Sequence, residues 1–345
     1  MENEFITKYS YSKLSTYKDC PYKFKLIYID GKFINTPSIA TSFGTLVHYT
    51  EECIANDLKN GLKIDYDKYI NQFIEINDEK EGLFGVKKLK EMFPDDFYKE
   101  DKSGMKYSDK CALYVNESIY RLESYLKANP NLEIVGIEQP FNVIYKNYAF
   151  HGFIDRVFKD KVTNKIIIED IKTYSKEVEK KNLTTPLQFV FYTLAAEELY
   201  NVSENDISCA YDLPVCLLKQ EAGTKGYLTR GLKKIDELLN LIETNQFKPN
   251  PTPLCHWCTF CPTYDNQPEE AKGYCPYYSK WTPDNKTFEV EYMWMGQEEH
   301  DAILQAFREK DFNKDNLMSN NLNTLLNDNL IIVNSNNKRF FKIKL

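Results

Sequence analysis

Two carboxylates and a lysine stand at the ends of apolar, strand-like segments of this chain. Asp155 closes the run Gly152-Phe153-Ile154, and Asp170 and Lys172 follow the run Ile166-Ile167-Ile168. An unpaired buried carboxylate is costly, so such groups usually bind a cation or pair with one another. Because strand side chains alternate, Lys172 is expected on the same face as Asp170. Asp155 and Asp170 could share a divalent ion, which together with Lys172 and a water would make a hydrolytic site.

The chemistry of such a site depends on how the ion is held. Mg²⁺ usually takes one or two carboxylates together with waters and phosphate oxygens. Lys172 would then orient or help to deprotonate the attacking water and offset the charge of a scissile phosphate. The alternative is a structural salt bridge at the strand ends, Asp170 with Lys172 or Asp155 with Arg156, since ionic networks also occur there.

Three further side chains could join this site. His48 lies in a helix-like segment and could supply a neutral imidazole ligand, although a lone histidine is more often structural. Gln188 and Tyr192 are four residues apart and share one helical face. Gln188 could hydrogen-bond a phosphate or the attacking water, and Tyr192 could contact DNA. The alternative for this pair is an ordinary amphipathic helix.

Nine cysteines occur in the chain, and their spacing favours a metal or cluster site over disulfides. Cys255 and Cys258 form a C-x2-C pair, which Cys261 and Cys275 follow. Three or four thiols within about twenty residues usually bind a metal or a cluster. The other plausible donor is Cys20, which would tie the first helix to the C-terminal loop. The spacing leaves both an iron–sulfur cluster and a zinc site open.

The segments that would position these residues follow a mixed order. The expected insertion, about 58–128, is helical and charge-rich up to 107 and ends in an amphipathic helix, 108–128. Asn147 and Asn164 predict turns between three consecutive strands. The resulting β-β-β-α-β-α order predicts an α/β (α+β) protein with a small mixed sheet flanked by helices. The other expected elements are helices at 10–30 (interrupted at Cys20-Pro21), 42–57, 186–201 and 227–246, and strands at 133–145, 149–158, 165–172 and 206–217.

Composition bounds the class of protein. The 345 residues are 42% hydrophobic and 28% charged, which suits a globular chain. No apolar run is long enough for a transmembrane helix and no basic, then apolar N-terminus marks export, so a cytoplasmic protein without a membrane partner is expected. The net charge of −7 argues against a protein that coats DNA nonspecifically. It is compatible with a nuclease that grips DNA through a local basic patch.

Taken together, these motifs resemble the PD-(D/E)XK nuclease superfamily over about residues 9–280. Within it, they resemble the RecB-like exonucleases that carry an iron–sulfur cluster, such as the Cas4 nucleases and the nuclease domain of AddB. The matching elements, in the family's order, are Cys20-Pro21 in the first helix, Gly44 to His48, Gly152 to Asp155, Asp170-Ile171-Lys172, Gln188 to Tyr192, and the late cysteines.

The resemblance implies a restriction-endonuclease-like core and assigns roles to the motif residues. His48, Asp155, Asp170 and the Ile171 carbonyl would hold Mg²⁺ or Mn²⁺. Lys172 would serve the nucleophilic water, assisted by the glutamine and tyrosine of the helix. A structural 4Fe–4S cluster would be bound by Cys20, Cys255, Cys258 and Cys275. Cys261 is the alternative fourth ligand. Cys275 is preferred because Cys261 would continue a C-x2-C-x2-C run, which is unusual for the family.

The expected function is therefore a metal-dependent DNA exonuclease of recombination, repair or phage replication. Residues 1–285 would form the nuclease domain, with the cysteine cluster at 255–275, and 286–345 a small C-terminal extension. No P-loop motif occurs, so a helicase, single-strand-binding or recombination protein is the expected partner. The composition is typical of a phage or low-GC bacterial protein. The alternatives are a non-catalytic DNA-binding partner protein and a zinc-stapled structural protein.

Overall fold

The computed structural model describes most of the chain and divides it into two compact units. The first, here the sheet unit, comprises Met1–Tyr11 and Pro37–Glu237, and the second, the cysteine unit, comprises Ser12–Thr36 and Leu238–Leu345. The described residues are 7–34, 36–101, 103–250, 255, 258–260, 268–272, 274–275, 279–282, 287–290, 330–335 and 338–343. The predicted boundary between 285 and 286 lies outside them and stays a prediction.

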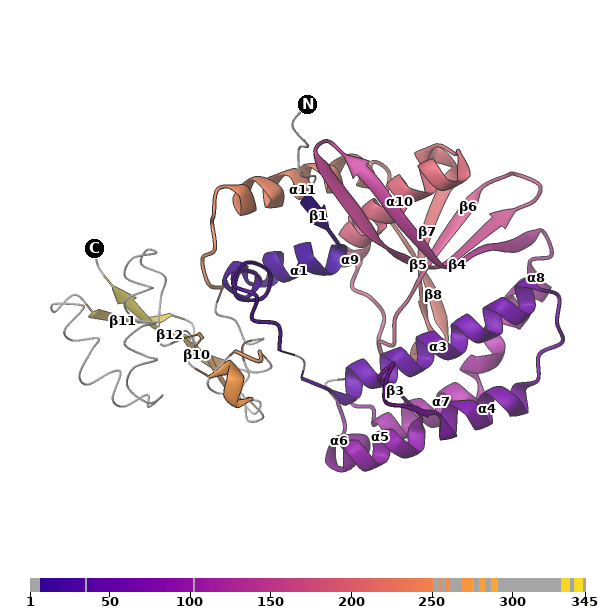
Figure 1. The fold of residues 1–345 in the computed structure, drawn as a ribbon, viewed down its shortest axis with the longest axis horizontal. Helices are drawn as coiled ribbons and strands as arrows, with labels where there is room; N and C mark the ends of the chain where they lie inside the picture. The colour runs from indigo at the N-terminus through magenta and orange to yellow at the C-terminus, as the bar shows by residue number, and fades with distance from the viewer. Residues whose placement is uncertain are drawn as a thin grey trace. The chain divides into compact units, whose positions relative to one another are not determined.

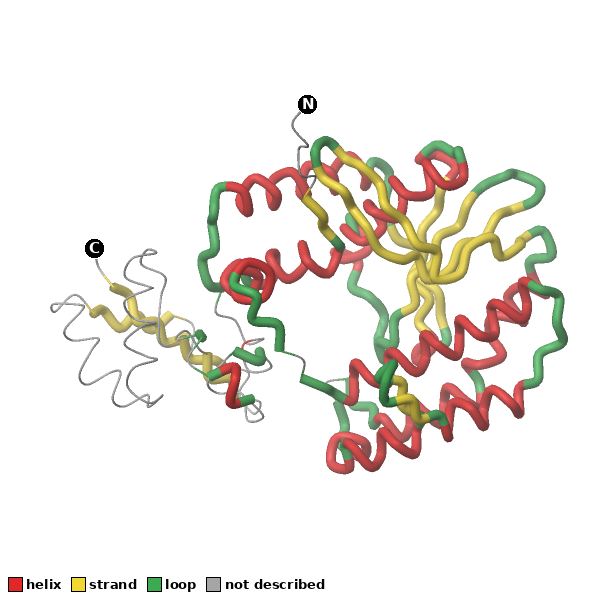
Figure 2. The backbone as a smooth tube through the Cα atoms, viewed as in Figure 1, coloured by secondary structure: helices red, strands yellow, loops and turns green. Residues whose placement is uncertain are grey.

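The sheet unit is built on six strands of mixed direction (Figures 1 and 2). The strand order is β1-β5-β6-β7-β8, and β4 also pairs with β5. The β1–β5 and β6–β7 pairs are parallel, and the other pairs are antiparallel. This mixed sheet confirms the predicted fold class. The strands are β1 (Thr7–Tyr9), β4 (Leu132–Tyr145), β5 (Tyr148–Asp160), β6 (Ile166–Ile171), β7 (Ile207–Leu213) and β8 (Leu218–Ala222).

Helices cover both faces of this sheet (Figure 1). On one face, α10 (Leu187–Tyr200) packs Phe191 against Phe150 and Phe189 against Tyr211. On the other face, α3 and the helices of the predicted insertion form one hydrophobic core with residues such as Phe158 and Ile171. The parallel β6–β7 pair needs a crossover connection, and α10 supplies it. Two more helices, α9 (Lys180–Thr184) and α11 (Tyr227–Glu243), flank α10 in the sequence.

Helix α3 (Ile39–Lys59) is the longest of the insertion-side helices, and its sequence explains its course. Ser38 caps it, because its side chain accepts a hydrogen bond from the Thr41 backbone N–H at 3.2 Å. Leu46, Val47 and Ile54 are spaced along one face and are completely buried. The helix therefore presents a fixed face to the sheet, and His48 is carried on it.

The insertion is mostly helical, as predicted, with one correction. The expected helix 108–128 breaks at Glu117, where the backbone leaves helical geometry and a 3₁₀ turn begins. The Ser118 hydroxyl there donates to the Pro214 carbonyl at 2.7 Å, a contact distant in sequence. The elements are α4 (Tyr66–Glu75), β2 (Asn77–Asp78), β3 (Leu83–Phe84), α5 (Val86–Met92), α6 (Pro94–Tyr98), α7 (Tyr107–Asn116), η2 (Ser118–Tyr120) and α8 (Arg121–Ala128).

The turns of the sheet are close to the sequence-based expectation. The β4–β5 loop is Lys146-Asn147 and the β5–β6 loop contains Asn164, which has a positive φ of 57°. The predicted strand 206–217 was wrong at its end: β7 stops at Leu213, because Pro214 cannot continue the ladder and starts the 3₁₀ turn η4 (Pro214–Cys216). The chain then returns as β8, a strand that the sequence pattern did not reveal.

The cysteine unit joins an early segment to a late one. It contains most of α1 (Tyr11–Asp19), then α2 (Pro21–Phe24) and the π-helical turn η1 (Lys25–Ile29), so the predicted interruption at Cys20-Pro21 is confirmed. The Tyr22 hydroxyl donates to the Tyr274 carbonyl at 2.7 Å, and the Asn250 amide donates to the Asp19 carbonyl at 2.9 Å. The first helices are thus tied to the region of the late cysteines.

The tail contributes backbone pairing to the same unit. Its four strands form a sheet of order β11-β12-β10-β9. The rest of the predicted C-terminal extension, 286–345, lies outside the described residues. The strands are β9 (Ser279–Thr282), β10 (Thr287–Val290), β11 (Leu330–Ser335) and β12 (Lys338–Ile343), and the short turn η6 (Glu269–Ala271) precedes them.

None of the helices described combines the length and the apolar content that a bilayer span requires.

Candidate active site

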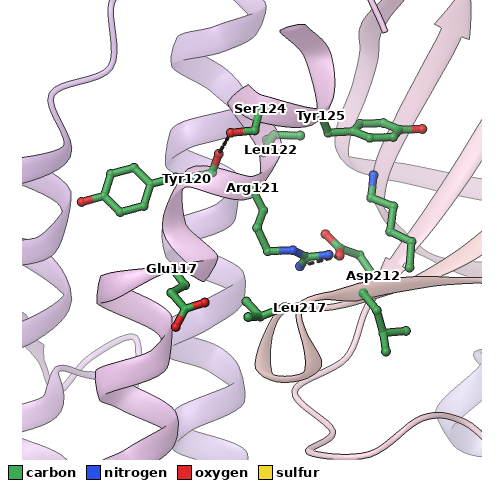
Figure 3. A pocket seen from close by; sticks show the side chains of 10 residues that line it. Glu117, Tyr120, Arg121, Leu122, Ser124, Tyr125, Asp212 and Leu217 are labelled. Atoms are coloured by element: carbon green, nitrogen blue, oxygen red, sulfur yellow. Dashed lines mark hydrogen bonds and ion pairs between the residues drawn. The ribbon is translucent and has the colours of Figure 1, made fainter. Parts of the chain in front are cut away.

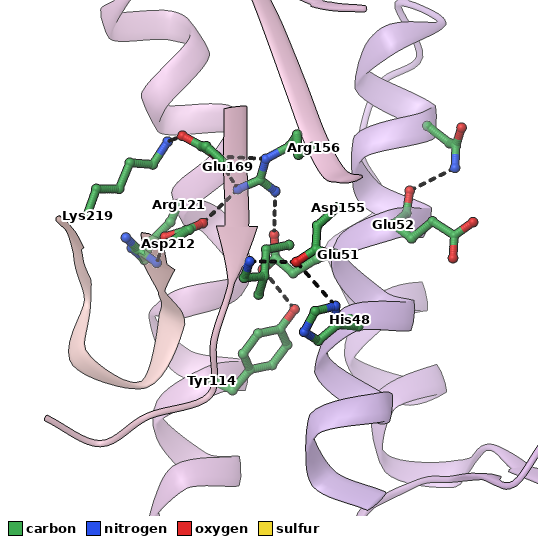
Figure 4. Close-up of polar contacts among 12 residues, drawn as sticks. His48, Glu51, Glu52, Tyr114, Arg121, Asp155, Arg156, Glu169, Asp212 and Lys219 are labelled. Carbon is green, nitrogen blue, oxygen red and sulfur yellow. Dashed lines mark hydrogen bonds and ion pairs between the residues drawn. The ribbon is translucent and has the colours of Figure 1, made fainter. Parts of the chain in front are cut away.

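Four elements of the sheet unit bring the predicted motif residues together. Asp155 comes from β5, Asp170 from β6 and His48 from α3. The His48 Nδ1 atom lies 3.8 Å from Asp155 Oδ2, and the Ile171 backbone N–H donates to that same oxygen at 2.6 Å (Figure 4). The Asp155 carboxylate is therefore held from two sides, by a helix and by the end of the neighbouring strand.

Glu138 is a member of this cluster that the sequence analysis missed. It lies on β4, and its Oε1 is 4.0 Å from His48 Nδ1. Among the described residues, His48, Glu138 and Asp155 form the one group of metal-binding side chains whose ligand atoms all lie within 4.8 Å of one another. Glu138 also has a φ of 40°, which is unusual for a residue other than glycine, and such backbone outliers occur more often at functional sites.

A sequence signal for Glu138 did exist. The two-residue loop Lys146-Asn147 sets the register of the hairpin, and the partners Ile137–Arg156 and Gln139–Ile154 place Glu138 directly opposite Asp155. An acidic residue at that position of a predicted strand is the signal, and counting back from the predicted turn would have located it.

Asp170 and Lys172 form the second half of the site. Asp170 is fully buried, and its Oδ2 lies 2.5 Å from the Lys172 ammonium. The same oxygen accepts no hydrogen bond of good geometry from the described residues. The predicted structural salt bridge between these two residues is thus present. A buried carboxylate oxygen with a lone pair left over is nevertheless a suitable metal ligand.

Helix α10 contacts Asp170 through a short chain of hydrogen bonds. The Tyr192 hydroxyl donates to Asp170 Oδ1 at 3.3 Å and in turn accepts from Gln188 Nε2 at 2.7 Å. Tyr192 is only 4% exposed. The predicted pair thus lies at the site, and the burial of the tyrosine favours a role that acts through Asp170 over a direct DNA contact.

The electrostatics of the cluster favour a bound cation. Burial and the neighbouring Asp170 raise the pKa of Asp155 to about 7. Burial alone would lower the pKa of His48, but Glu138 and Asp155 raise it. Burial would likewise lower the pKa of Lys172, and Asp170 and Asp155 raise it instead. The shifts of His48 and Lys172 reflect the neighbouring carboxylates, and that of Asp155 reflects burial first and Asp170 second. A divalent ion would neutralise the carboxylate charge that Lys172 by itself does not balance.

The predicted cluster cysteines lie in the cysteine unit. Cys20, Cys258 and Cys275 pack around one apolar group that contains Tyr22 and Phe260. None of the eight described cysteines is in a disulfide. Burial raises the pKa of Cys20, and burial raises the pKa of Cys258 to about 12; Cys255 is close enough to raise both further. Cys261 lies outside the described residues.

Comparison with known proteins identifies the family. The model of the PD-(D/E)XK nuclease superfamily matches residues 8–263. The chain belongs to the PD-(D/E)XK nuclease superfamily. This superfamily member shows the mixed sheet flanked by helices that a restriction-endonuclease-like fold requires.

Two other comparisons add little. No curated protein matches the chain. Among solved structures, the crystal structure of a "Putative exonuclease" from Eubacterium rectale is similar, with 12% identity and a TM-score of 0.37 over 74% of this chain and 86% of that chain. A likeness this distant supports no conclusion about the activity of the chain.

Proposed function

We propose that this member of the superfamily is a Mg²⁺- or Mn²⁺-dependent DNA exonuclease. The observation that carries the proposal is a gathering of three carboxylates beside one lysine. Asp155 and the partly exposed Glu138 lie beside His48, and Asp170 is fully buried. Lys172 is the one lysine in ion-pair contact with them among the described residues. Carboxylates gathered in this way favour a bound cation.

His48, Glu138, Asp155 and Asp170 would hold the ion, with the Ile171 carbonyl as the further ligand that the family resemblance implies. A divalent ion at this place would acidify a water and neutralise charge on a phosphate. Lys172 stays protonated because its pKa is raised, so it would orient the water and attract the scissile phosphate. Tyr192 and Gln188 would keep Asp170 in the rotamer that faces the ion.

A pocket of about 710 Å³ adjoins the site. Its lining includes Thr173, the residue after Lys172, together with residues from the start of α3 and from the insertion. Several of its lining side chains carry hydroxyls, which can donate to phosphate oxygens. These hydroxyl residues are Thr41, Ser103, Tyr107, Thr173, Tyr174 and Ser175.

The first test is nuclease activity of anaerobically purified protein on DNA. End-labelled linear single- and double-stranded DNA is incubated with Mg²⁺, with Mn²⁺ or with EDTA. We expect metal-dependent release of label by the wild type and by Lys165→Ala, an exposed lysine of the β5–β6 turn that serves as the matched control. Lys172→Ala should lose at least about 100-fold in rate while it retains DNA binding. Wild-type cleavage by Lys172→Ala would refute the assigned site. DNA binding without cleavage by the wild type would favour a non-catalytic partner protein.

We also propose the RecB-like subtype, with a 4Fe–4S cluster in the cysteine unit. Cys20, Cys258 and Cys275 pack around one apolar group, and Cys255 is close enough to raise the pKa of Cys20 and Cys258. Thiols from two distant segments gathered in this way usually bind a metal or a cluster. The family resemblance favours the cluster. Iron, sulfide and zinc analysis of the purified protein tests this, and a colourless protein with one zinc would contradict it.

The cluster proposal leaves the fourth ligand to be settled between Cys261 and Cys275. Separate Cys261→Ala and Cys275→Ala variants decide it, because one should keep its iron and the other should lose it. A helicase, single-strand-binding or recombination protein remains the proposed partner.

A further inference from the structure

The residue after Asp155 enters a second, separate group of charges. Arg156 is 1% exposed and binds three carboxylates (Figure 4). Its Nε and Nη2 donate to Glu169 Oε2 at 2.9 and 2.8 Å. Its Nη1 donates to Glu51 Oε2 at 3.1 Å, and its Nη2 also donates to Asp212 Oδ2 at 2.7 Å. A planar guanidinium can hold several acceptors in fixed directions, which a lysine cannot.

Two outer cations complete this group. Arg121 Nη1 lies 2.9 Å from Asp212 Oδ1, and the Lys219 ammonium pairs with Glu169 Oε1. We call the set the Arg156 network; its members are Glu51, Arg121, Arg156, Glu169, Asp212 and Lys219. It holds three cations and three carboxylates, so its charges balance.

The balance of charges in the Arg156 network shows that it is not a binding site for an ion. Arg121, Asp212 and Lys219 line a pocket of about 390 Å³ beside α8 and β8 (Figure 3). Both cations there already pair with a carboxylate, so neither is left to attract an anion. The group of His48, Glu138 and Asp155, by contrast, has two carboxylates and no lysine or arginine. The network therefore links structural elements of this chain to one another.

Each inner member of the network is attached to a residue of the proposed active site. Glu51 lies one helical turn after His48 on α3. Arg156 follows Asp155 on β5, and Glu169 precedes Asp170 on β6. On β7, the Asp212 carbonyl accepts the backbone N–H of Lys172 at 2.9 Å. One guanidinium thus joins the four elements that carry or hold the site.

We propose that the Arg156 network is a positioning device that sets the relative placement of α3, β5, β6 and β7, and with it the distances between the metal ligands. This inference rests on the proposed metal-dependent activity. Arg156 is a positioning residue, since its contacts are with other side chains of the network and not with the site. Groups that orient metal ligands typically affect metal affinity or activity 10–100-fold.

The test uses Arg156→Lys and Glu51→Gln in the full-length protein. Lysine keeps the charge but loses the three-way geometry, and glutamine keeps the shape but loses the charge of the α3 contact. We expect each variant to raise the Mn²⁺ dissociation constant about tenfold in calorimetry. We also expect a fall of similar size in kcat with an unchanged KM for DNA.

Leu89→Ala is the matched control for lost stability. Leu89 is buried in the insertion core, and no described contact joins it to the network. It should lower the melting temperature by as much as the network variants do, while the Mn²⁺ dissociation constant and kcat stay at the wild-type values.

A double-mutant cycle separates positioning from general loosening. If Glu51 acts through α3 on His48, Glu51→Gln should weaken Mn²⁺ binding in the wild type but not in a His48→Ala background. An equal effect in both backgrounds would overturn this placement role. So would wild-type Mn²⁺ affinity and kcat in both Glu51→Gln and Arg156→Lys. If Arg156→Lys does not fold, Glu51→Gln and its cycle decide.

The calorimetric measurement also separates this inference from the proposed function. A wild-type protein that binds Mn²⁺ but cleaves no DNA would refute the nuclease proposal, and the variants would still test the network. A wild-type protein that cleaves DNA, with variants that match it in both measurements, would refute the network alone. A wild-type protein that binds no Mn²⁺ would refute both.

Discussion

At the scale of single residues, Asp155 and Arg156 are neighbours with opposite surroundings. Burial, and then the neighbouring Asp170, raise the pKa of Asp155 to about 7. Arg156 faces carboxylates that it neutralises together with Arg121 and Lys219. Both groups reach helix α3, since His48 contacts Asp155 and Glu51, one helical turn further along, pairs with Arg156. The two groups differ in charge: three carboxylates lie beside one lysine around Asp155, whereas the Arg156 network has equal numbers of cations and carboxylates.

The raised pKa of Asp155 predicts how metal binding depends on pH. Below about pH 7 the buried carboxyl holds a proton that Mn²⁺ must displace, so the Mn²⁺ dissociation constant should rise as the pH falls, by up to about tenfold per unit. Above pH 7 it should level off. Calorimetry from pH 5.5 to 8.5 measures this, and a dissociation constant that is flat across the range would contradict it.

Glu138 predicts a second effect on the ion. Glu138→Gln keeps the side-chain volume but removes one charge from the cluster, so Mn²⁺ binding should weaken about tenfold. The pH dependence should persist, because Asp155 is unchanged. Calorimetry against the exposed control Glu133→Gln on the same strand checks this, and equal affinities would exclude Glu138 as a ligand.

At the scale of elements, the active site depends on how closely α10 approaches its neighbours. Gly231 of α11 packs against α10, where an added Cβ would come within 2.2 Å of Val190 Cγ2. Val190 lies between Gln188 and Tyr192 on α10. The absence of a side chain at 231 therefore sets the position of the helix that holds Asp170.

Gly231→Ala should accordingly be harmful although alanine favours helices. The gain of about 1 kcal/mol in helix propensity competes with an overpacking cost of about 1–3 kcal/mol. We expect a lower melting temperature and reduced cleavage, and we expect Val190→Ala to restore both in the double variant. A Gly231→Ala protein that is more stable than the wild type would contradict the close packing.

At the scale of the whole molecule, the chain forms two units from segments that are not continuous in sequence. The cysteine unit joins Ser12–Thr36 to Leu238–Leu345. The Tyr17 hydroxyl, for example, bonds the Gln246 carbonyl 229 residues away. A cluster that links the two segments would hold them together and would therefore matter greatly for the stability of the unit.

We therefore predict that Cys20→Ala loses the cluster and that the cysteine unit unfolds with it. Loss of a structural metal site is among the changes that cost more than about 4 kcal/mol. We expect loss of iron and rapid proteolysis of the segments around Cys20 and Cys255. Cys53→Ala, a half-buried cysteine of α3 outside the cluster set, is the control. A folded, protease-resistant Cys20→Ala protein that keeps its iron would refute the linking role.

The sequence by itself determined the local features of this protein. Strand alternation, the turns at Asn147 and Asn164, and the break at Cys20-Pro21 depend on neighbouring residues, so their patterns are readable in one dimension. Asp155 and Asp170 were singled out because each stands where an apolar run is interrupted by a charge, and His48 joined them through its match to the family motif from Gly44 to His48. The end of β7 was missed although Pro214 marked it.

Only the tertiary structure decided which charges meet. Arg156 reads as a possible partner of Asp155, yet its partners lie 13, 56 and 105 residues away. Glu138 joins the metal cluster through strand pairing, and Tyr192 turns its hydroxyl to Asp170 because α10 packs on the sheet. Burial and charge balance are properties of a three-dimensional neighbourhood. They separate the group with more carboxylates than lysines, where we propose a cation, from the network whose charges balance, and no spacing along the chain carries that distinction.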